Sequence, residues 1–184
     1  MNLHGSYTSP YVRHCRIALA EESLDFQFVP TDFTQSGQQS PTKRVPFMQD
    51  GELFLCDSSA ILTHIRAKAG KGFLTDAADA DRYFMASTAL DTGINLFLLE
   101  KDGLTNSPYI DRQKARMQTT FQALENGMAA WDGNLNDGFL RLACLLTWVT
   151  FRNRFDFSSF IKLTAFDSEV SQNALLKETM PPQS

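Results

Sequence analysis

The sequence has little of what stabilises or anchors several common classes of protein. Its 184 residues include only three cysteines, Cys15, Cys56 and Cys144, which form neither a C-x-x-C pair nor a zinc pattern. Such sparse thiols are typical of a reducing compartment and argue against a disulfide framework. The 10 glycines and 7 prolines are also too few for a collagen-like or low-complexity chain.

An excess of one charge and long apolar runs are missing as well. The 17 basic and 21 acidic residues leave a formal net charge of −4, which argues against a nucleic-acid surface or attraction to an anionic membrane. The N-terminal residues lack the basic flank and apolar run of a signal peptide. The most apolar window, residues 140–151, contains Arg141 and is too short to span a bilayer. We therefore expect a cytoplasmic protein.

Phenylalanine is what the sequence has in quantity, with 15 residues against 4 tyrosines and 2 tryptophans. Because phenylalanine carries no polar group, most of these side chains must be buried in a core, an interface or a pocket. A chain of this length buries roughly 70% of its unfolded surface, which leaves room for a large core. We expect four of them in the core of a helical region: Phe139, Phe151, Phe155 and Phe160.

Residue patterns divide the chain into two domains. Residues 1–70 alternate short strand-like and helical segments, and residues 80–184 consist of one helical segment after another, with a linker at 71–79. Two strands are predicted at 2–7 and 25–30, with a helix between them. This order predicts a βαβ unit with a right-handed crossover.

Local signals mark where the helices and a hairpin of the first domain begin. Ser9 followed by Pro10 is a helix start signal, because serine caps a helix and proline suits its first position. Asp57 and the serines after it cap a second helix. Between these two helices, the Asp-Gly pair at 50–51 predicts the turn of a β-hairpin. Residues 32–44 are predicted to form a loop or a short irregular helix.

The second domain contains four or more predicted helices joined by short loops, which is typical of a bundle. Helical patterns extend over 79–101, 107–128 and 139–151, and shorter helices are predicted between 158 and 178.

Three motifs of the first domain resemble motifs of the glutathione S-transferase family. They are Ser-Pro-Tyr-Val-Arg at 9–13, Val-Pro-Phe-Met at 45–48 and Asp-Ser-Ser-Ala-Ile at 57–61, in the order and rough spacing of that family. The chain is identified as a member of the family, similar to bacterial proteins with a serine in the active site. The resemblance implies an α/β thioredoxin-like N-terminal domain followed by an all-α helical bundle, assembled as a homodimer.

The resemblance also implies that the chain binds glutathione as a co-substrate and activates its thiol, because the thiolate is the nucleophile. A free thiol has a pKa of about 8.5, so populating its thiolate at neutral pH needs a shift of one or two units, roughly 1.4–2.7 kcal/mol. A helix N-terminus offers backbone donors and a positive dipole end to that anion. Ser9 lies at such a terminus, and the resemblance to serine-type members of the family implies that it is the catalytic residue; the alternative is that it only caps its helix.

Five further residues are expected to hold glutathione by the same resemblance. Pro46 is the family's cis-proline, an uncommon bond, and it leaves the backbone of Val45 free to pair with the cysteinyl amide like an added strand. Asp57 and Ser58 are expected to take the ammonium and the carboxylate of the γ-glutamyl end, and Arg44 the glycyl carboxylate. The alternatives are an edge-strand proline, a helix cap and a solvated arginine.

A pocket for the electrophile is expected between the two domains. Its candidate walls are Tyr11, Phe33, Leu90 and Ile94, with the alternative that these side chains are only core. The implied function is conjugation of the glutathione thiolate to small hydrophobic electrophiles, as in detoxification, through thiolate stabilisation and proximity. The alternatives are a non-catalytic binding or regulatory protein on this scaffold, and a glutathione-dependent disulfide reductase, which would prefer cysteine where Ser9 stands.

The histidines give no reason to expect a metal. His4, His14 and His64 lie outside any metal-ligand or catalytic-triad spacing, and we interpret them as structural or surface residues.

One departure from the family concerns the start of the helix predicted from residue 139. Relatives often begin this helix with a Ser/Thr-x-x-Asp capping motif, but here Asn136 is followed three residues later by Phe139. Asn136 can still cap the helix, whereas the reciprocal bond is lost, at a cost of about 1 kcal/mol.

Overall fold

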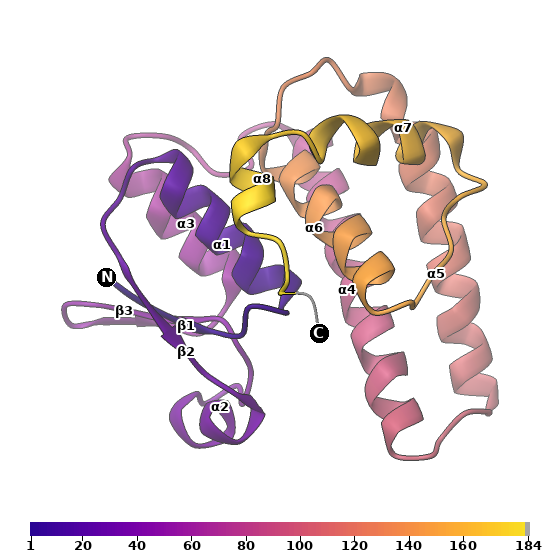
Figure 1. The fold of residues 1–184 in the computed structure, drawn as a ribbon, viewed down its shortest axis with the longest axis horizontal. Coiled ribbons are helices and arrows are strands. Elements are labelled where there is room, and N and C mark those ends of the chain that lie inside the picture. The colour runs from indigo at the N-terminus through magenta and orange to yellow at the C-terminus, as the bar shows by residue number, and fades with distance from the viewer. Residues whose placement is uncertain (183–184) are drawn as a thin grey trace. The chain divides into compact units, whose positions relative to one another are not determined.

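The computed structural model describes residues 1–182, and its contacts divide the chain into two compact units (Figure 1). The first unit contains Met1–Phe73 together with the segment that begins at Gln172, and the second contains Leu74–Ser171. From the sequence, the segment from Gln172 onward was expected in the second domain, which was predicted to span residues 80–184. The structure places this segment in the first unit instead. The contacts that hold this segment join residues 163 and 166 positions apart, a distance at which local patterns carry no signal.

A four-stranded mixed sheet forms the centre of the first unit, as expected for a thioredoxin-like domain. Its strands are β1 (Asn2–Gly5), β2 (Gln27–Pro30), β3 (Phe47–Asp50) and β4 (Leu53–Leu55). Their order is β2-β1-β3-β4, with β2 parallel to β1, and with the β1–β3 and β3–β4 pairs antiparallel. A helix connects the parallel pair, so the predicted βαβ unit is present.

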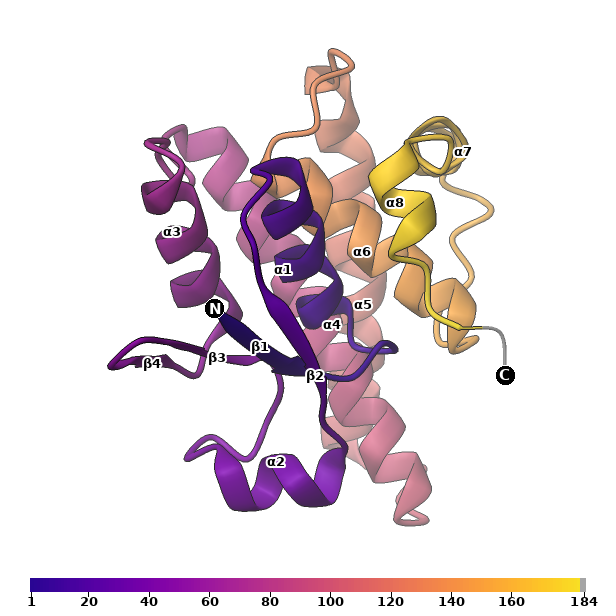
Figure 2. The same cartoon turned by 60° about the vertical axis from the view of Figure 1, so that its left-hand side comes forward.

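Helices lie on both sides of this sheet (Figures 1 and 2). The helices α1 (Pro10–Glu21) and α3 (Ser58–Lys68) pack against one another on one side, and α2 (Phe33–Gln39) lies on the other. Gly5 permits the close approach of α1 to β1, because a Cβ at this position would lie 2.5 Å from Val12 Cγ2. The fully buried side chains of this unit include Leu3, Val12, Leu19, Met48, Ile61 and Ile65.

The segment at 32–44 contains the regular helix α2. Asp32 accepts a hydrogen bond from the Gln35 backbone N–H at 2.8 Å, and the Gln35 side chain accepts one from the Asp32 N–H at 2.9 Å. This reciprocal capping box satisfies two N–H groups at the start of the helix. It explains why a polar segment that contains a glycine still folds as a helix.

The second unit is all-helical, as predicted. Its helices are α4 (Ala77–Lys101), α5 (Pro108–Gly127), α6 (Asp137–Phe151) and α7 (Ile161–Val170), with a short 3₁₀ helix at Met128–Ala130. Helix α4 packs against α5 and α6, and α7 packs against the same two helices. Helix α6 is buried along most of its length. One further helix, α8 (Ala174–Glu178), belongs to the first unit.

Aromatic side chains fill much of the core of the second unit. Phe121 is fully buried, and the ring centroids of Phe155 and Phe160 lie 4.1 and 6.1 Å from its own. Of the four phenylalanines expected in this core, Phe139 and Phe160 are buried, whereas Phe151 and Phe155 are half-buried.

The start of α6 is capped from two directions. Asn136 Oδ1 accepts a hydrogen bond from the Phe139 N–H at 3.0 Å, as expected from the sequence. In place of an acid at position 139, a carboxylate reaches this helix start from α4: Asp79 Oδ1 accepts from the Gly138 N–H at 2.9 Å. Burial raises the pKa of Asp79, although this hydrogen bond and the Arg82 charge oppose the rise.

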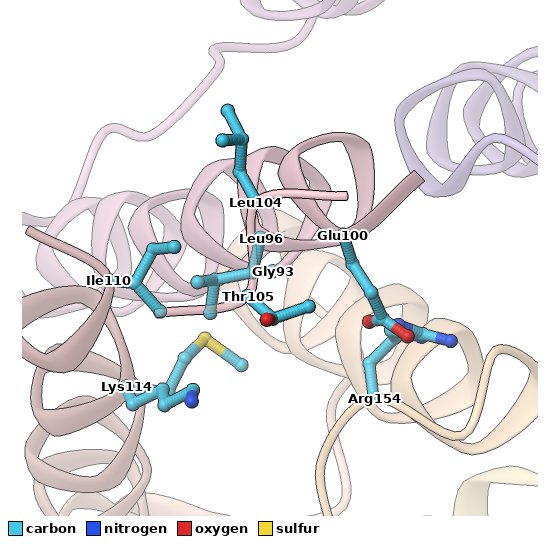
Figure 3. A pocket seen from close by; sticks show the side chains of 9 residues that line it. Gly93, Leu96, Glu100, Leu104, Thr105, Ile110, Lys114 and Arg154 are labelled. Carbon is cyan, nitrogen blue, oxygen red and sulfur yellow. The ribbon is translucent and has the colours of Figure 1, made fainter. Parts of the chain in front are cut away.

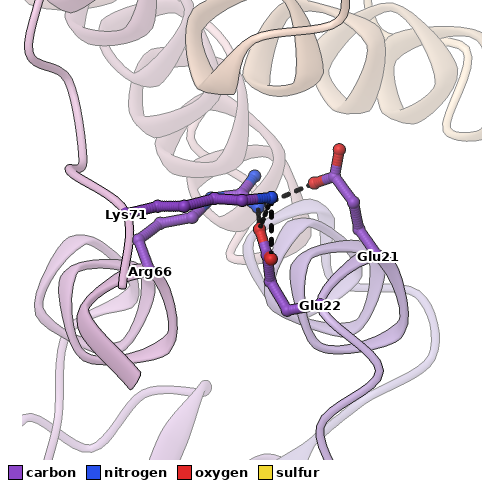
Figure 4. A network of polar contacts seen from close by, with 4 residues as sticks. All are labelled: Glu21, Glu22, Arg66 and Lys71. Carbon is purple, nitrogen blue, oxygen red and sulfur yellow. Dashed lines mark hydrogen bonds and ion pairs between the residues drawn. The ribbon is translucent and has the colours of Figure 1, made fainter. Parts of the chain in front are cut away.

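An ion-pair network joins the end of α1 to the end of α3 (Figure 4). Arg66 of α3 pairs with Glu21 at 2.7 Å and also with Glu22, and Lys71 pairs with Glu22 at 2.8 Å. The side chains of Arg66 and Glu22 are only 6% and 5% exposed. Burial raises the pKa of Glu22, but hydrogen bonds from Lys71 and Arg66 outweigh it and keep that pKa below its usual value.

Replacing Glu22 with glutamine should weaken this network. The substitution removes one carboxylate from a largely buried pair while Glu21 still faces Arg66, so we expect the free energy of unfolding to fall by about 1–3 kcal/mol. Urea denaturation at pH 7 measures the change. Glu52→Gln is the matched control, since Glu52 is exposed in the hairpin and its effect should stay within about 0.5 kcal/mol. Equal stability of the two variants would contradict a stabilising network.

Asp50 lies at the centre of a second polar network, between β3 and α3. Its Oδ2 accepts from Lys68 Nζ and contacts His64 Nε2, both at 2.8 Å. The hydrogen bonds from Lys68 and then His64 lower the pKa of Asp50 from 3.8 to about 2. His64, for which the sequence suggested no partner, is therefore a structural residue with a specific carboxylate beside it.

This lowered pKa predicts a dependence of stability on pH. Because the pKa of Asp50 is lower in the folded than in the unfolded state, its carboxylate stabilises the protein above about pH 4, and that contribution disappears between about pH 4 and pH 2. Asp50→Asn should therefore lower the free energy of unfolding at pH 7 and leave it nearly unchanged at pH 2. Urea titrations at both pH values measure this, and an equal loss at both would contradict the assignment.

Candidate functional site

The sheet brings the residues expected to bind glutathione to one end of its strands. In the strand register, Gly5 at the end of β1 pairs with the last residue of β2, and His4 pairs with the first residue of β3. The last residue of β4 pairs with the second residue of β3. The ends of β1, β2 and β4 therefore lie together with the start of β3 (Figure 2). The segments that carry Ser9, Val45-Pro46 and Asp57-Ser58 enter or leave the sheet at this end.

Ser9 occupies the N-cap of α1 and is half-buried. Its Oγ accepts a hydrogen bond from the Val12 N–H at 3.3 Å, and its carbonyl accepts from the Arg13 N–H at 3.0 Å. Pro10 holds the first helical position, as expected. A hydroxyl that accepts through a lone pair keeps its own hydrogen for another acceptor. Capping the helix and donating to a thiolate are therefore compatible roles for Ser9.

The Val45–Pro46 peptide bond is cis, as the family resemblance implied, and it directly precedes β3. Pro46 is buried and Val45 is half-buried. Arg44, the residue before them, is exposed, so its guanidinium is open to a carboxylate in solution. These three residues lie at the start of β3, beside the end of β1.

Asp57 and Ser58 form the start of α3. The exposed Asp57 is the N-cap and accepts from the Ser59 N–H at 2.7 Å. Ser58 is buried, and its carbonyl oxygen lies 4.0 Å from Cys15 Sγ of α1. One oxygen of Asp57 serves the cap, which leaves the other for an ammonium group, and the helix N-terminus favours a carboxylate.

The residues expected to line an electrophile pocket are divided between the two units. Tyr11 is half-buried on α1, and Phe33, the first residue of α2, is 81% exposed. In the second unit, Leu90 is fully buried on α4 and Ile94 is half-buried. A common pocket formed by these four residues stays a prediction.

A cavity of about 270 Å³ lies within the second unit (Figure 3). Its lining includes Gly93 of α4 and Met117 of α5, and its rim carries an ion pair between Arg154 and Glu100 at 2.5 Å. Leu90 and Ile94 do not line this cavity.

No metal centre is apparent in residues 1–182, where no group of three or more His, Cys, Asp or Glu side chains is arranged to hold an ion. His4 stacks on Phe47 with ring centroids 4.4 Å apart, and burial lowers the pKa of His4.

Among residues 1–182, no helix combines the length and the hydropathy needed to cross a bilayer.

Arg13 is a residue of α1 to which the sequence motifs give no role. It lies one turn after Ser9, is 2% exposed and bonds to residues of the C-terminal segment. Besides its place at the end of the family-like motif at 9–13, its signal in the sequence is a charge on a helix whose neighbouring positions, Val12 and Cys15 among them, are apolar and buried. A buried charge requires polar partners, but the sequence does not say which.

Comparison with known proteins supports the glutathione S-transferase family. Residues 3–72 match the family model described as "Glutathione S-transferase, N-terminal domain". The chain is 34% identical over 83 residues to "Probable glutathione S-transferase GSTF2" of Oryza sativa, a match that covers 41% of this chain and 39% of the rice protein. It is 25% identical over 144 residues to "Glutathione S-transferase 1" of Zea mays, covering 68% of this chain and 67% of the maize protein. The chain thus spans about two fifths of the length of the rice relative.

Solved structures share the fold over nearly the whole chain. A glutathione S-transferase from Methylobacillus flagellatus with GSH bound superposes with a TM-score of 0.87 at 19% identity, covering 98% of this chain and 99% of that one. A second, from Methylobacterium radiotolerans in complex with glutathione sulfonate, gives a TM-score of 0.88 at 17% identity, covering 100% and 95%. These likenesses confirm the predicted fold class, a thioredoxin-like α/β domain followed by an all-helical domain.

Proposed function

We propose that this chain, whose relatives support the glutathione S-transferase family, conjugates the thiolate of glutathione to small hydrophobic electrophiles from a serine-type site. The observation that carries the proposal is the meeting of three segments at one end of the sheet. They are the cap of α1 at Ser9, the cis bond at Val45–Pro46 and the cap of α3 at Asp57. Fold relatives with glutathione bound support the same ligand.

The three segments present complementary groups to the three parts of glutathione. At the start of α3, Asp57 takes the ammonium of the γ-glutamyl end, and Ser58 with the helix N-terminus takes its carboxylate. The backbone of Val45 pairs with the cysteinyl amide, and Arg44 takes the glycyl carboxylate. In this orientation the thiol faces the start of α1.

The start of α1 then stabilises the thiolate. The Ser9 hydroxyl donates a hydrogen bond to the sulfur, and the positive end of the helix dipole favours the negative charge, so the thiol pKa falls. The thiol proton leaves to solvent. The thiolate attacks the electrophilic carbon, a C–S bond forms, and the leaving group departs with its electron pair. No covalent bond to the protein is needed, because the site contributes charge stabilisation and proximity.

Two measurements on the full chain test binding and activity separately: calorimetry measures the binding of glutathione, and a conjugation assay measures turnover. We expect glutathione to bind with a Kd between roughly 1 μM and 1 mM, and an activated aryl halide to be conjugated in its presence. S-methylglutathione is the matched ligand, because it keeps the binding groups but has no free thiol. It should bind and inhibit conjugation. Binding without turnover would favour a non-catalytic protein, and no binding at millimolar glutathione would overturn the proposal.

A further inference from the structure

Arg13 of α1 is a buried cation held by the C-terminal segment. Its Nη2 donates to the Leu176 carbonyl at 2.8 Å and to Met180 Sδ at 3.3 Å, and its Nε donates to Thr179 Oγ1 at 3.3 Å. All three acceptors are uncharged. Within residues 1–182, no carboxylate pairs with this guanidinium. Its polar partners therefore come from the segment after residue 172.

The hydrogen bond from Arg13 to the Leu176 carbonyl caps the C-terminal end of α8. Helix α8 lies beside α1 (Figure 1). Carbonyls in the last turn of a helix lack partners within the helix and carry the negative end of its dipole. Leu176 contributes such a carbonyl, and Arg13 supplies both the donor and the charge. The Thr179 hydroxyl also donates to the Leu175 carbonyl at 2.7 Å, and so fixes its oxygen in place for Arg13.

Arg13 also belongs to the first turn of α1. Its backbone N–H donates to the Ser9 carbonyl at 3.0 Å, next to the bond between the Val12 N–H and Ser9 Oγ. The ends of helices fray unless surrounding structure holds them. The Arg13 side chain holds this turn from outside the helix, through partners 163 to 167 positions away in the sequence.

We propose that Arg13 is a positioning residue for Ser9. By anchoring the first turn of α1 to residues 176–180, it keeps the Ser9 hydroxyl where the glutathione sulfur requires it. This inference rests on the proposed function and adds the C-terminal segment to the parts of the chain on which the site depends. Arg13 itself touches no ligand in this scheme, because it acts through the backbone of Ser9.

Amide hydrogen exchange of the full chain tests the anchor without reference to activity. Arg13→Lys keeps the charge but loses the planar fork that reaches Leu176 and Thr179 together, so amides in residues 11–14 should exchange about 10-fold faster. Thr179→Val removes one acceptor and should produce a smaller increase. Lys177→Gln, exposed on the same segment, is the matched control and should produce none. Unchanged exchange in Arg13→Lys would overturn the anchor.

A double-mutant cycle tests whether the anchor acts through Ser9. With Ser9 present, Arg13→Lys should lower kcat/KM about 10-fold and raise the apparent pKa of the thiol in the pH–rate profile. In a Ser9→Ala background, the same change should alter kcat/KM by less than about two-fold. Equal losses in both backgrounds would overturn the positioning role.

Together, the exchange experiment and the double-mutant cycle distinguish a failure of this inference from a failure of the proposed function. If the unsubstituted chain neither binds nor conjugates glutathione, the proposed function fails, and the exchange rates still decide whether Arg13 anchors α1. If Arg13→Lys does not fold, Thr179→Val takes its place in both arms, with the same direction of effect expected and the same outcomes overturning the anchor.

Discussion

Conjugation of an activated aryl halide is expected to slow by about 10- to 100-fold at neutral pH when Ser9 is replaced by alanine. The factor corresponds to the one to two pKa units by which a hydrogen bond to the sulfur lowers the thiol pKa. Alanine removes the hydroxyl that caps the Val12 N–H and, in the proposed mechanism, donates to the thiolate. The rate should recover at high pH, where the thiol ionises without help, so the pH–rate profile shifts upward.

Ser9→Thr is the matched control, because threonine keeps a hydroxyl and also caps helices. Its activity should stay within a few-fold of the unsubstituted chain. Thermal unfolding serves as a check on the fold, since the lost cap in Ser9→Ala costs about 1 kcal/mol by itself. Glutathione affinity should change little, because its charged ends are held elsewhere in the proposal. An alanine variant with an unshifted pH–rate profile would leave Ser9 as a helix cap only.

Gly138→Ala is expected to lower the free energy of unfolding by about 3–5 kcal/mol. A Cβ at this position would lie 2.6 Å from the Asp79 carbonyl oxygen and closer still to Asp79 Oδ1. Helices α4 and α6 would have to separate, and the hydrogen bond from the Gly138 N–H to the buried Asp79 would be lost. Thermal unfolding should show a midpoint lower by about 10 °C.

Gly127→Ala is the control for the cost of adding a methyl group to a helical glycine. Gly127 ends α5, and nothing lies within 4 Å of the Cβ position, so alanine there should be neutral or slightly stabilising. The double variant Asp79→Ala, Gly138→Ala should recover part of the loss, because the shorter side chain removes the contact with Oδ1. Equal midpoints for Gly138→Ala and Gly127→Ala would contradict the packing of α4 against α6.

Several elements of the fold, those that carry the site among them, follow from local signals in the sequence. The caps Ser9, Asp57 and Asn136 each bind a backbone N–H two or three residues further along the chain. The Asp-Gly pair at 50–51 turns the chain between two strands that pair directly. The family-like motifs also anticipated the cis bond at Val45–Pro46. Such interactions join near neighbours, so residue types and their spacing are enough to predict them.

The partners of the buried polar groups were decided only by the tertiary structure. Asp79 meets a helix start 59 positions away, and Arg13 meets a carbonyl 163 positions away. His64 lies only 14 positions from Asp50, yet the two meet across the packing of α3 against β3. Periodicity predicts which positions are buried, but a buried charge or N–H must find a polar partner wherever packing brings one. The sequence alone therefore determined the motifs and most of the helices and strands, although it left α2 open. The packed chain determined which buried polar groups meet.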